Sequence, residues 1–530
     1  MLDLLIKNGT ICDGSGKPSY RGDIGVKDKK IVAIGSVEAN QDSKVIEAEG
    51  LVVSPGFIDF HTHSDLALLG EPSATAKITQ GVTTEIIGHC GISAFPFSKE
   101  TYALSKRYTS SVLAFKSMEW DWLSLGEYFA LLSSRRIAVN VGALIGHGSL
   151  RIAVMGFENR KPTHEDMSKM KGLLIEGLEQ GAFGLSTGLA YVPGCYADLD
   201  ELSELTEVVA QFGGIYSTHL RNQSESLVEC VEEAIEIGRR TGASIQISHL
   251  KAVGKMYQSN AIRVLDLIEK AQIEGIDVTA DQYPYLAGSS TITAILPPWV
   301  LEGGMDEMLK RLQSNDCRKA IKYDLLHGID GWENRVELLG WENIFVSSLK
   351  KSRNKHYEGK NLEEIAIIGG KSPEDTLFDL LIDESGNIGQ IAYTSSEDTM
   401  RIIMKSPYVM IGSDGLYVDE GKTHPRLFGT FPRLLGKYVR EEHVITLEEA
   451  IRKITYLPAK KLGFNDRGLI KEGMMADITI FDKNIINDNA TFSEPFIQSE
   501  GIKYVIVNGE LILENGQITG KLPGTVIRRG

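Results

Sequence analysis

Short apolar runs separated by turn signals occupy both ends of the chain. The breaks between the runs are Asn-Gly, Asp-Gly and similar dipeptides, which is typical of short β-strands joined by turns. Each end alone is too short to bury a good hydrophobic core. The pattern therefore predicts one β-sandwich built from residues 1–53 and 470–530 around a central domain. The runs are Leu4 to Ile6, Asp23 to Val26, Lys30 to Gly35, Val45 to Ala48, Leu51 to Val53, Ala476 to Asp482, Tyr504 to Gly509 and Glu510 to Gly516.

Between the two ends, in residues 54–469, apolar strand-like runs alternate with stretches of helical periodicity. The helical stretches include Leu199 to Phe212, Glu225 to Arg240 and Ala261 to Glu274. The strand-like runs end near Phe60, Ile87, Leu144, Leu185, Ser217, Ser248, Ala280 and Ile411. Eight strand–helix repeats predict an α/β fold, a (β/α)8 TIM-type barrel, in which active sites lie at the C-terminal ends of the strands.

The regular spacing breaks after the seventh predicted strand. The long interval before the eighth strand contains Pro297-Pro298-Trp299 and a helical stretch from Met305 to Lys322. Long loops without secondary structure are uncommon in compact domains. We therefore predict a small inserted subdomain at about residues 287–345 of the barrel.

Composition narrows the class of protein without deciding its activity. Of the 530 residues, 42% are hydrophobic and 24% are charged, as in ordinary globular proteins. A net charge of −15 argues against nucleic acid and against an anionic membrane surface as partners. The five cysteines are odd in number and scattered, so we expect no disulfide framework and a reducing, cytoplasmic location. The oligomeric state stays open.

Side chains that bind metals follow five of the eight predicted strands. They are His61 and His63 after the first strand, Cys90 after the second, His219 at the fifth, His249 at the sixth and Asp414 at the eighth. The two histidines of the first strand are two residues apart and project from one face. In a barrel all six side chains lie on the same rim. Zinc accepts imidazole, thiolate and carboxylate ligands and keeps an open position at catalytic sites.

Each of these residues alone has a structural interpretation, because a single buried His or Cys is more often a satisfied polar group or an inert thiol. Their coincidence at matching strand ends favours a metal site. His89 is a weaker candidate and fits a supporting or structural role. We also expect structural roles for His147, His164, His327 and His356, which fall outside this pattern.

Several of these motifs resemble those of a known superfamily. The segment Pro55 to His63, the later Gly412-Ser413-Asp414 and the late Gly473 to Ile478 are similar to amidohydrolase motifs. Within that superfamily the chain resembles the N-acyl-D-amino-acid deacylases (D-aminoacylases), through Gly88 to Gly91, Ser248 to Lys251 and His424 to Phe431. The resemblance covers nearly the whole chain and is weakest in the insertion and the segment after it.

The resemblance implies a set of metal ligands. In that family one zinc ion is held tightly by a cysteine and two histidines, which correspond here to Cys90, His219 and His249. The paired histidines, here His61 and His63, offer a second and weaker site that the cysteine can bridge. Many relatives bridge with a carboxylated lysine on the fourth strand. The run Gly181 to Gly188 contains no lysine, which separates this chain from the hydantoinases and dihydroorotases.

Asp414 is the candidate catalytic base. Zinc lowers the pKa of a bound water toward ~7 and polarises an amide carbonyl, and a nearby carboxylate can move the proton from the water to the leaving amine. Asp414 also has a structural interpretation, since an aspartate before glycine caps turns. Its position at the end of an apolar strand, on the rim of the histidines, favours catalysis.

An amino-acid product requires recognition of its α-carboxylate, for which arginine, lysine and hydroxyl groups are suitable donors. By resemblance we assign this binding to Lys251, Tyr283, Ser289 and Arg426. Lys251 lies two residues beyond His249, and Tyr283 closely follows the seventh strand. The alternatives are a solvated charge for the lysine and the arginine, and a core aromatic for the tyrosine.

The expected function is zinc-dependent hydrolysis of the N-acyl amide of small N-acyl-D-amino acids, which releases a carboxylate and a free D-amino acid. The preference for D-amino acids rests on the resemblance alone. One alternative is another amidohydrolase that acts on a cyclic amide, a lactone or a dipeptide. The other alternative is a non-catalytic barrel protein. The complete set of ligand residues argues against this alternative.

Overall fold

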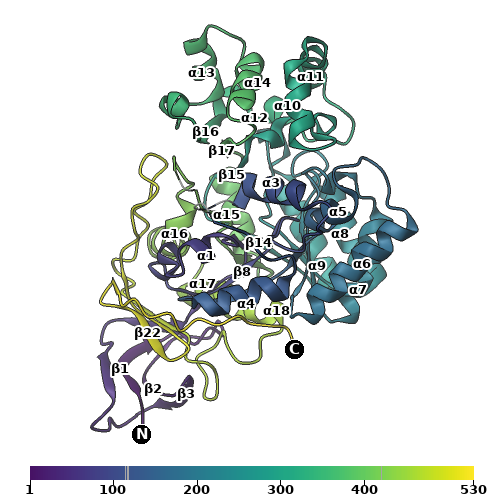
Figure 1. Ribbon diagram of the computed structural model, residues 1–530. Coiled ribbons are helices and arrows are strands. Elements are labelled where there is room, and N and C mark those ends of the chain that lie inside the picture. Colours follow the sequence, from purple (N-terminus) through teal and green to yellow (C-terminus); the bar gives the residue numbers. More distant parts are fainter. Residues whose placement is uncertain (114, 116–117, 419) are drawn as a thin grey trace.

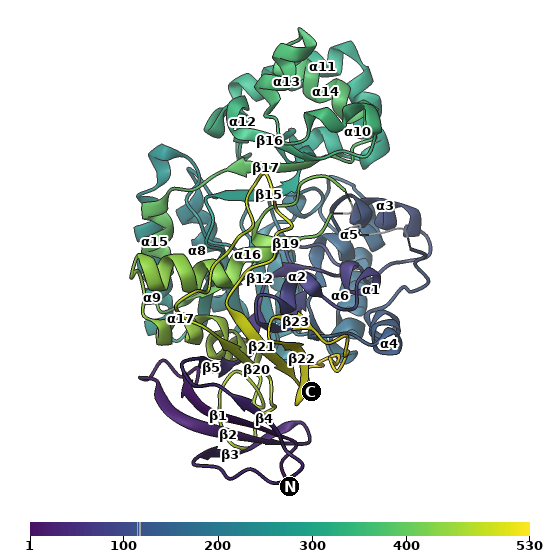
Figure 2. The same ribbon diagram turned by 90° about the vertical axis from the view of Figure 1, so that its left-hand side faces the viewer.

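The structure, a computed structural model, describes residues 1–113, 115, 118–418 and 420–530. Three parts follow one another along the molecule (Figures 1 and 2). A β-module built from strands of both ends of the chain lies at one end, the barrel lies in the middle and an inserted unit of helices and a small sheet lies at the other end. None of the helices in these residues is long and apolar enough to cross a membrane.

Both ends of the chain contribute strands to one nine-stranded sheet. Its strands are β1 (Leu4–Ile11), β2 (Tyr20–Lys27), β3 (Lys30–Gly35), β4 (Lys44–Glu47), β5 (Val52–Pro55), β20 (Ile478–Phe481), β21 (Ile502–Val507), β22 (Glu510–Glu514) and β23 (Gln517–Ile518). The ends meet where β5 pairs with β20 in antiparallel register, with Val53 opposite Ile480. Isoleucines from both ends, such as Ile6 and Ile478, share one buried cluster. This shared core explains why neither end could form the module alone.

Eight parallel strand positions form the barrel. They are β6 (Phe57–Asp59), β8 (Val82–Ile87), the interrupted pair β9 (Asn140–Ala143) and β10 (Ile145–Gly146), β11 (Gly184–Gly188), β12 (Ile215–His219), β13 (Ser244–Ile247), β14 (Val278–Gln282) and β18 (Val409–Ile411). The eighth strand position is joined to the first, just beyond β18 and β6, by a backbone hydrogen bond of 2.7 Å from Asp414 N to His61 O. Parallel strands bring their C-terminal ends to one rim, which is where the predicted ligands lie.

Amphipathic helices cover the outside of the barrel. They include α7 (Leu199–Gln211), α8 (Leu227–Thr241) and α9 (Asn260–Ile273), which follow β11, β12 and β13 in turn. Helix α7 begins at Asp198, whose side chain accepts a hydrogen bond from Glu201 N, and α8 ends at Gly242 in the left-handed conformation. The predicted helices are therefore present, with local signals at their ends.

The inserted unit has its own sheet and its own core. The sheet has the order β15 (Ala287–Thr291), β17 (Gly389–Tyr393) and β16 (Ile344–Ser348), and the helices are α10 (Met305–Gln313), α11 (Asn315–His327), α12 (Arg335–Leu339), α13 (Leu362–Gly369) and α14 (Pro373–Asp383). Leu312 and Phe378 belong to one buried cluster of this unit. Because residues beyond 345 share this sheet and core, we place the insertion at 287–393 instead of 287–345.

The predicted helical run from Met305 to Lys322 is two helices. Ser314 ends α10 and caps α11, where its side chain accepts a hydrogen bond from Cys317 N. Serine favours such caps because its oxygen satisfies a backbone N–H that has no partner inside the helix.

A buried lysine connects the first and last strands of the barrel. Lys77, in α2 (Thr75–Ile78), is fully buried, and its Nζ lies 2.6 Å from Asp59 Oδ2 and 2.8 Å from Ser413 Oγ. Ser413 also bonds Asp59 through its backbone N–H at 2.8 Å. The lysine thus holds the residue before Asp414 against the strand that precedes His61.

We expect Lys77→Met to lower the free energy of unfolding by ~3–5 kcal/mol, because it leaves Asp59 as a buried charge without its partner. Denaturant unfolding followed by circular dichroism measures this loss. Lys310→Met, at an exposed position of α10, is the matched control and should leave the unfolding midpoint unchanged. An unchanged midpoint for Lys77→Met would mean that the pair contributes nothing to stability.

Candidate metal centre

The six predicted ligands lie together on the rim of the barrel. His61 and His63 follow β6, with His63 in β7 (Thr62–His63), and Cys90 follows β8. His219 is the last residue of β12, while His249 and Asp414 follow β13 and β18. All six are at most 9% exposed. The sequence placed them at strand ends, and the fold brings those ends to one buried point.

Three of these residues adopt left-handed backbone conformations. The φ angles are +53° at Cys90, +34° at His249 and +49° at Asp414. Residues with a side chain rarely adopt such angles, and strained residues concentrate at functional sites. The backbone here turns sharply as it leaves each strand, which directs the side chains inward.

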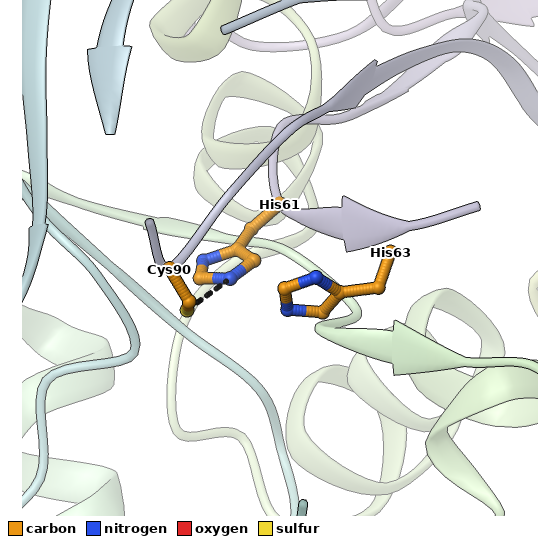
Figure 3. A group of neighbouring side chains, drawn as sticks. All are labelled: His61, His63 and Cys90. Carbon is orange, nitrogen blue, oxygen red and sulfur yellow. Dashed lines mark hydrogen bonds between the residues drawn. The ribbon is translucent and has the colours of Figure 1, made fainter. Parts of the chain in front are cut away.

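The ligand atoms form three overlapping groups, in each of which all atoms lie within 4.8 Å of one another: His61, His63 and Cys90; Cys90, His219 and His249; His61, His249 and Asp414. Cys90 belongs to the first two groups, and its Sγ lies 3.4 Å from both His61 Nε2 and His249 Nε2. Figure 3 shows the imidazole rings of His61 and His63 together with the Cys90 sulfur, which a dashed line joins to the His61 ring. Cys90 is therefore a candidate ligand in two of the three groups.

The chemistry of the donors fits zinc. Burial raises the pKa of the Cys90 thiol, but the neighbouring His61 and His249 outweigh burial and hold this pKa well below its usual range. The thiolate is the form that binds metals. Both ring nitrogens of His219 are buried and make no hydrogen bond to any residue that the structure describes. A buried polar group without a partner is costly, and a bound ion would satisfy it.

Asp414 lies between the histidines and a buried arginine. Its Oδ1 is 3.1 Å from His63 Nε2 and 3.5 Å from His61 Nε2, and its Oδ2 is 2.8 Å from Arg426 Nη1. Burial raises the pKa of this carboxyl group, but Arg426 and His61 hold it well below its usual range. Asp414 is therefore ionised and able to accept a proton.

The four predicted carboxylate-binding residues lie next to this centre. Lys251, Tyr283 and Ser289 line the cavity that also contains the ligand side chains, whereas Arg426 is fully buried behind it, in α16 (Arg426–Arg433). The Arg426 guanidinium lies 4.5 Å from the centre of the Tyr283 ring and donates from Nη2 to Ser289 O at 3.3 Å. Arg426 Nε has no hydrogen-bond partner in the described residues.

The charges and donors of this group suit an anion. Burial lowers the pKa of Lys251 to about 8, which leaves the amine largely protonated at neutral pH. Burial raises the pKa of Tyr283, so its phenol remains a hydrogen-bond donor. A Cβ on Gly288 would lie 2.9 Å from the Tyr283 hydroxyl, so glycine at this position lets the backbone approach the phenol.

Asp281 is a site residue that the sequence analysis missed. Its Oδ1 lies 3.0 Å from His61 Nδ1 and accepts from His249 N at 2.8 Å, and its Oδ2 accepts from Gln246 Nε2 at 2.9 Å. A carboxylate on the far ring nitrogen fixes the orientation of a metal-binding histidine. The signal was present, since Asp281 directly follows Ala280 at a predicted strand end.

We expect Asp281→Asn to weaken zinc binding at the second position, that of His61 and His63, by about 10- to 100-fold while the fold is retained, because asparagine has a similar shape but no charge to orient His61. Competition with a chelator measures the zinc dissociation constant, and thermal melting checks the fold. Asp277→Asn, a change just before the other end of β14, is the control and should leave zinc binding unchanged. Equal zinc affinity in Asp281→Asn and the wild type would contradict this role.

Other contacts at the site come from residues that sequence reasoning passed over. Arg335, from the inserted unit, lines the cavity, and its Nε lies 3.2 Å from Glu333 Oε2. Gln223 Nε2 lies 3.3 Å from His249 Nδ1. Gln223 lies in the loop directly after β12, whereas no local pattern marks Arg335, which reaches the site from the inserted unit.

Two histidines that we did not assign as ligands, His89 and His147, have defined contacts. His89 stacks on His61 with ring centres 4.2 Å apart and lies outside the three ligand groups. His147 Nε2 lies 2.8 Å from Glu201 Oε1.

Comparisons with known proteins agree with this geometry. The model of the amidohydrolase family matches residues 44–233 and 324–513. The N-acyl-D-glutamate deacylase of Alcaligenes xylosoxydans xylosoxydans is 34% identical over 528 residues, which cover 100% of this chain and 97% of that protein. The D-aminoacylase of the same organism is 35% identical over 528 residues, covering 99% of this chain and 98% of that protein.

A solved structure extends the similarity to the whole fold. The crystal structure of N-acyl-D-glutamate deacylase from Bordetella bronchiseptica, in complex with zinc and a phosphonate that mimics the tetrahedral intermediate, superposes with a TM-score of 0.83. The two proteins are 32% identical, and the match covers 99% of each chain. The predicted barrel with its β-sandwich is thereby confirmed. The chain belongs to the amidohydrolase family and, within it, to the N-acyl-D-amino-acid deacylases (D-aminoacylases).

Proposed function

We propose that the protein is a zinc-dependent hydrolase that cleaves the amide bond of N-acyl-D-amino acids and releases a carboxylate and a free D-amino acid. One observation carries this proposal: Lys251 and Tyr283, donors for an α-carboxylate, line the same buried cavity as the cysteine and histidine ligands and Asp414. The preference for D-amino acids is supported by relatives named for D-amino-acid substrates.

Cys90, His219 and His249 would hold the tight zinc ion, and His61 and His63 would offer a weaker second position that shares Cys90. When bound, zinc supplies Lewis acidity that polarises the amide carbonyl and makes water easier to deprotonate. Strand β11 has no lysine that could bridge the two positions, which leaves Cys90 as the candidate for that role. The missing lysine argues against the alternative function, hydrolysis of a cyclic amide.

Asp414 would act first as a base and then as an acid. It takes one proton from the attacking water, whose oxygen forms the new bond to the acyl carbon, and returns that proton to the amine nitrogen as the C–N bond breaks. Arg426 keeps the carboxylate ionised before the reaction. Lys251, Tyr283 and Ser289, with Arg426 behind them, would hold the α-carboxylate and so orient the amide toward Asp414.

We also propose a reducing, cytoplasmic location, which the odd number and scattered spacing of the cysteines in the sequence support.

The test is a panel of matched N-acetyl-D- and N-acetyl-L-amino acids and one substituted hydantoin, with amine release followed for the purified zinc enzyme. We expect hydrolysis of the D substrates, with much slower hydrolysis of their L enantiomers and of the hydantoin. Cleavage of the hydantoin in preference to every N-acetyl-D-amino acid would select the cyclic-amide alternative. No turnover of any substrate by a zinc-loaded protein would support the non-catalytic alternative.

A further inference from the structure

His424 is a buried histidine outside the three ligand groups. Its Nδ1 accepts a hydrogen bond from Arg426 N at 3.0 Å, and its Nε2 lies 3.0 Å from Ala287 O. A backbone N–H can only donate and a carbonyl oxygen can only accept, so Nε2 carries the proton and Nδ1 carries none. Both ring nitrogens are therefore engaged by backbone groups, which leaves neither to bind an ion or to move a proton.

The His424 ring joins the two segments that carry Ser289 and Arg426. Ala287 is the first residue of β15, which also contains Ser289, and Arg426 is the first residue of α16. The first N–H groups of a helix have no partner inside it, and the ring supplies one for Arg426. The Arg426 side chain makes a second connection, from Nη2 to Ser289 O at 3.3 Å. The ring thus sets the separation of strand and helix, and with it the place of the guanidinium beside Tyr283.

A loop of the β-module supports this ring. The loop joins β20 to β21, over residues 482–501, and reaches the small sheet of the inserted unit (Figure 2). Its Phe492 lies with its ring centre 5.0 Å from that of His424, at an interplanar angle of 80°, and 5.5 Å from that of Tyr393 in β17. The Tyr285 ring lies 5.2 Å from His424 at 89°. Such edge-to-face contacts are favourable, and they hold the imidazole plane that the two hydrogen bonds require.

We infer that His424 is a positioning residue for the α-carboxylate site: its two hydrogen bonds hold β15 and the start of α16 at the separation at which Ser289 and Arg426 meet the same carboxylate. The inference rests on the proposed function and adds a residue that acts through Arg426 and not on the substrate. Positioning matters here because the strength of a charge-assisted hydrogen bond depends on its distance and direction.

His424→Phe tests this role, because phenylalanine keeps a ring of similar size and loses both hydrogen bonds. We expect KM for the best N-acetyl-D-amino acid to rise by about tenfold or more, while kcat changes by less than about threefold and the zinc content stays at the wild-type level. A residue that only stabilises the fold would instead lower the active fraction, and so kcat, without moving KM. His164→Phe, at an exposed position of α6 (His164–Glu179), is the matched control and should leave both constants unchanged. An unchanged KM in a folded, zinc-loaded His424→Phe overturns the inference.

Two further comparisons show whether the effect passes through Arg426 and the carboxylate. His424→Asn places an oxygen near the position of Nδ1, where it can accept from Arg426 N, so its KM should lie between those of the wild type and His424→Phe. The second comparison uses the same substrate with its carboxylate replaced by a primary amide, as a competitive inhibitor. Its inhibition constant should be the same in the wild type and in His424→Phe. Equal KM values for the two variants, or equal weakening of the acid and the amide, would overturn the inference.

Phe492→Ala reaches the same ring from outside and decides the matter if the His424 variants do not fold. It keeps both hydrogen-bonding partners and removes one support of the ring, so we expect KM to rise by about threefold or more. Ile497→Ala, at a 42% exposed position of the same loop, is its control and should leave KM unchanged. Thermal melting verifies the fold of each variant. Wild-type KM in all folded variants overturns the inference and leaves the proposed function intact, whereas no hydrolysis by the zinc-loaded wild type overturns both.

Discussion

Asp414→Asn is expected to lower kcat for N-acetyl-D-amino-acid hydrolysis by about 10³-fold while the zinc content stays at the wild-type level. Asparagine keeps an oxygen in place beside His63 and Arg426, but it cannot take a proton from water or deliver one to the amine. General acid–base catalysis typically contributes about 10²- to 10⁴-fold, so the loss falls in that range. Steady-state kinetics measure kcat and KM separately, and metal analysis measures zinc.

The control is Asp383→Asn, which changes a carboxylate paired with Arg353 on the inserted unit. It should leave kcat and KM unchanged. If Asp414→Asn kept more than about a tenth of the wild-type kcat with full zinc, Asp414 would be a structural cap and the base would have to be sought elsewhere.

Cys90→Ala is expected to remove the tightly bound zinc and, with it, nearly all activity. The Cys90 sulfur belongs to two of the three ligand groups. Zinc-based catalysis supplies several kcal/mol of transition-state stabilisation. A fall of at least about 10³-fold in kcat/KM follows from a loss of that size. Zinc per chain after dialysis and kcat/KM on the same sample measure both effects.

Cys230→Ala is the matched control, because Cys230 is also buried but lies in α8, away from the ligand groups. It should retain zinc and activity. Full zinc content and full activity in Cys90→Ala would show that the histidines alone hold the ion.

Much of the barrel could be predicted because its signals are local. Each strand is a short apolar run, and the ligand residues His61, Cys90 and His219 stand at the ends of such runs, so one rule places them together. The helix predicted at Ala261 to Glu274 is present as α9, but the apolar spacing of Ile262, Leu265 and Ile268 does not identify its buried face. Ala261, Val264 and Ile268 are buried, whereas Ile262 is 52% exposed.

The remaining features depend on contacts between distant segments. The insertion extends past residue 345 because β17 returns to pair with β15, a pairing that no local pattern predicts. Arg335 reaches the cavity from the same unit, and Glu333 neutralises it there. The burial of Arg426 behind Tyr283 likewise follows from packing, which no spacing in the sequence reveals.

The central claim is that zinc at this centre hydrolyses N-acyl-D-amino acids, and a zinc titration of the metal-free protein tests it most directly. Zinc is added in steps while hydrolysis of the best N-acetyl-D substrate and of its L enantiomer is measured. The expected result is no activity without metal, a rise toward a plateau near about one zinc per chain, and little turnover of the L enantiomer at any ratio. Full activity of the metal-free protein, or no hydrolysis of the D substrate at any zinc ratio, would contradict the account.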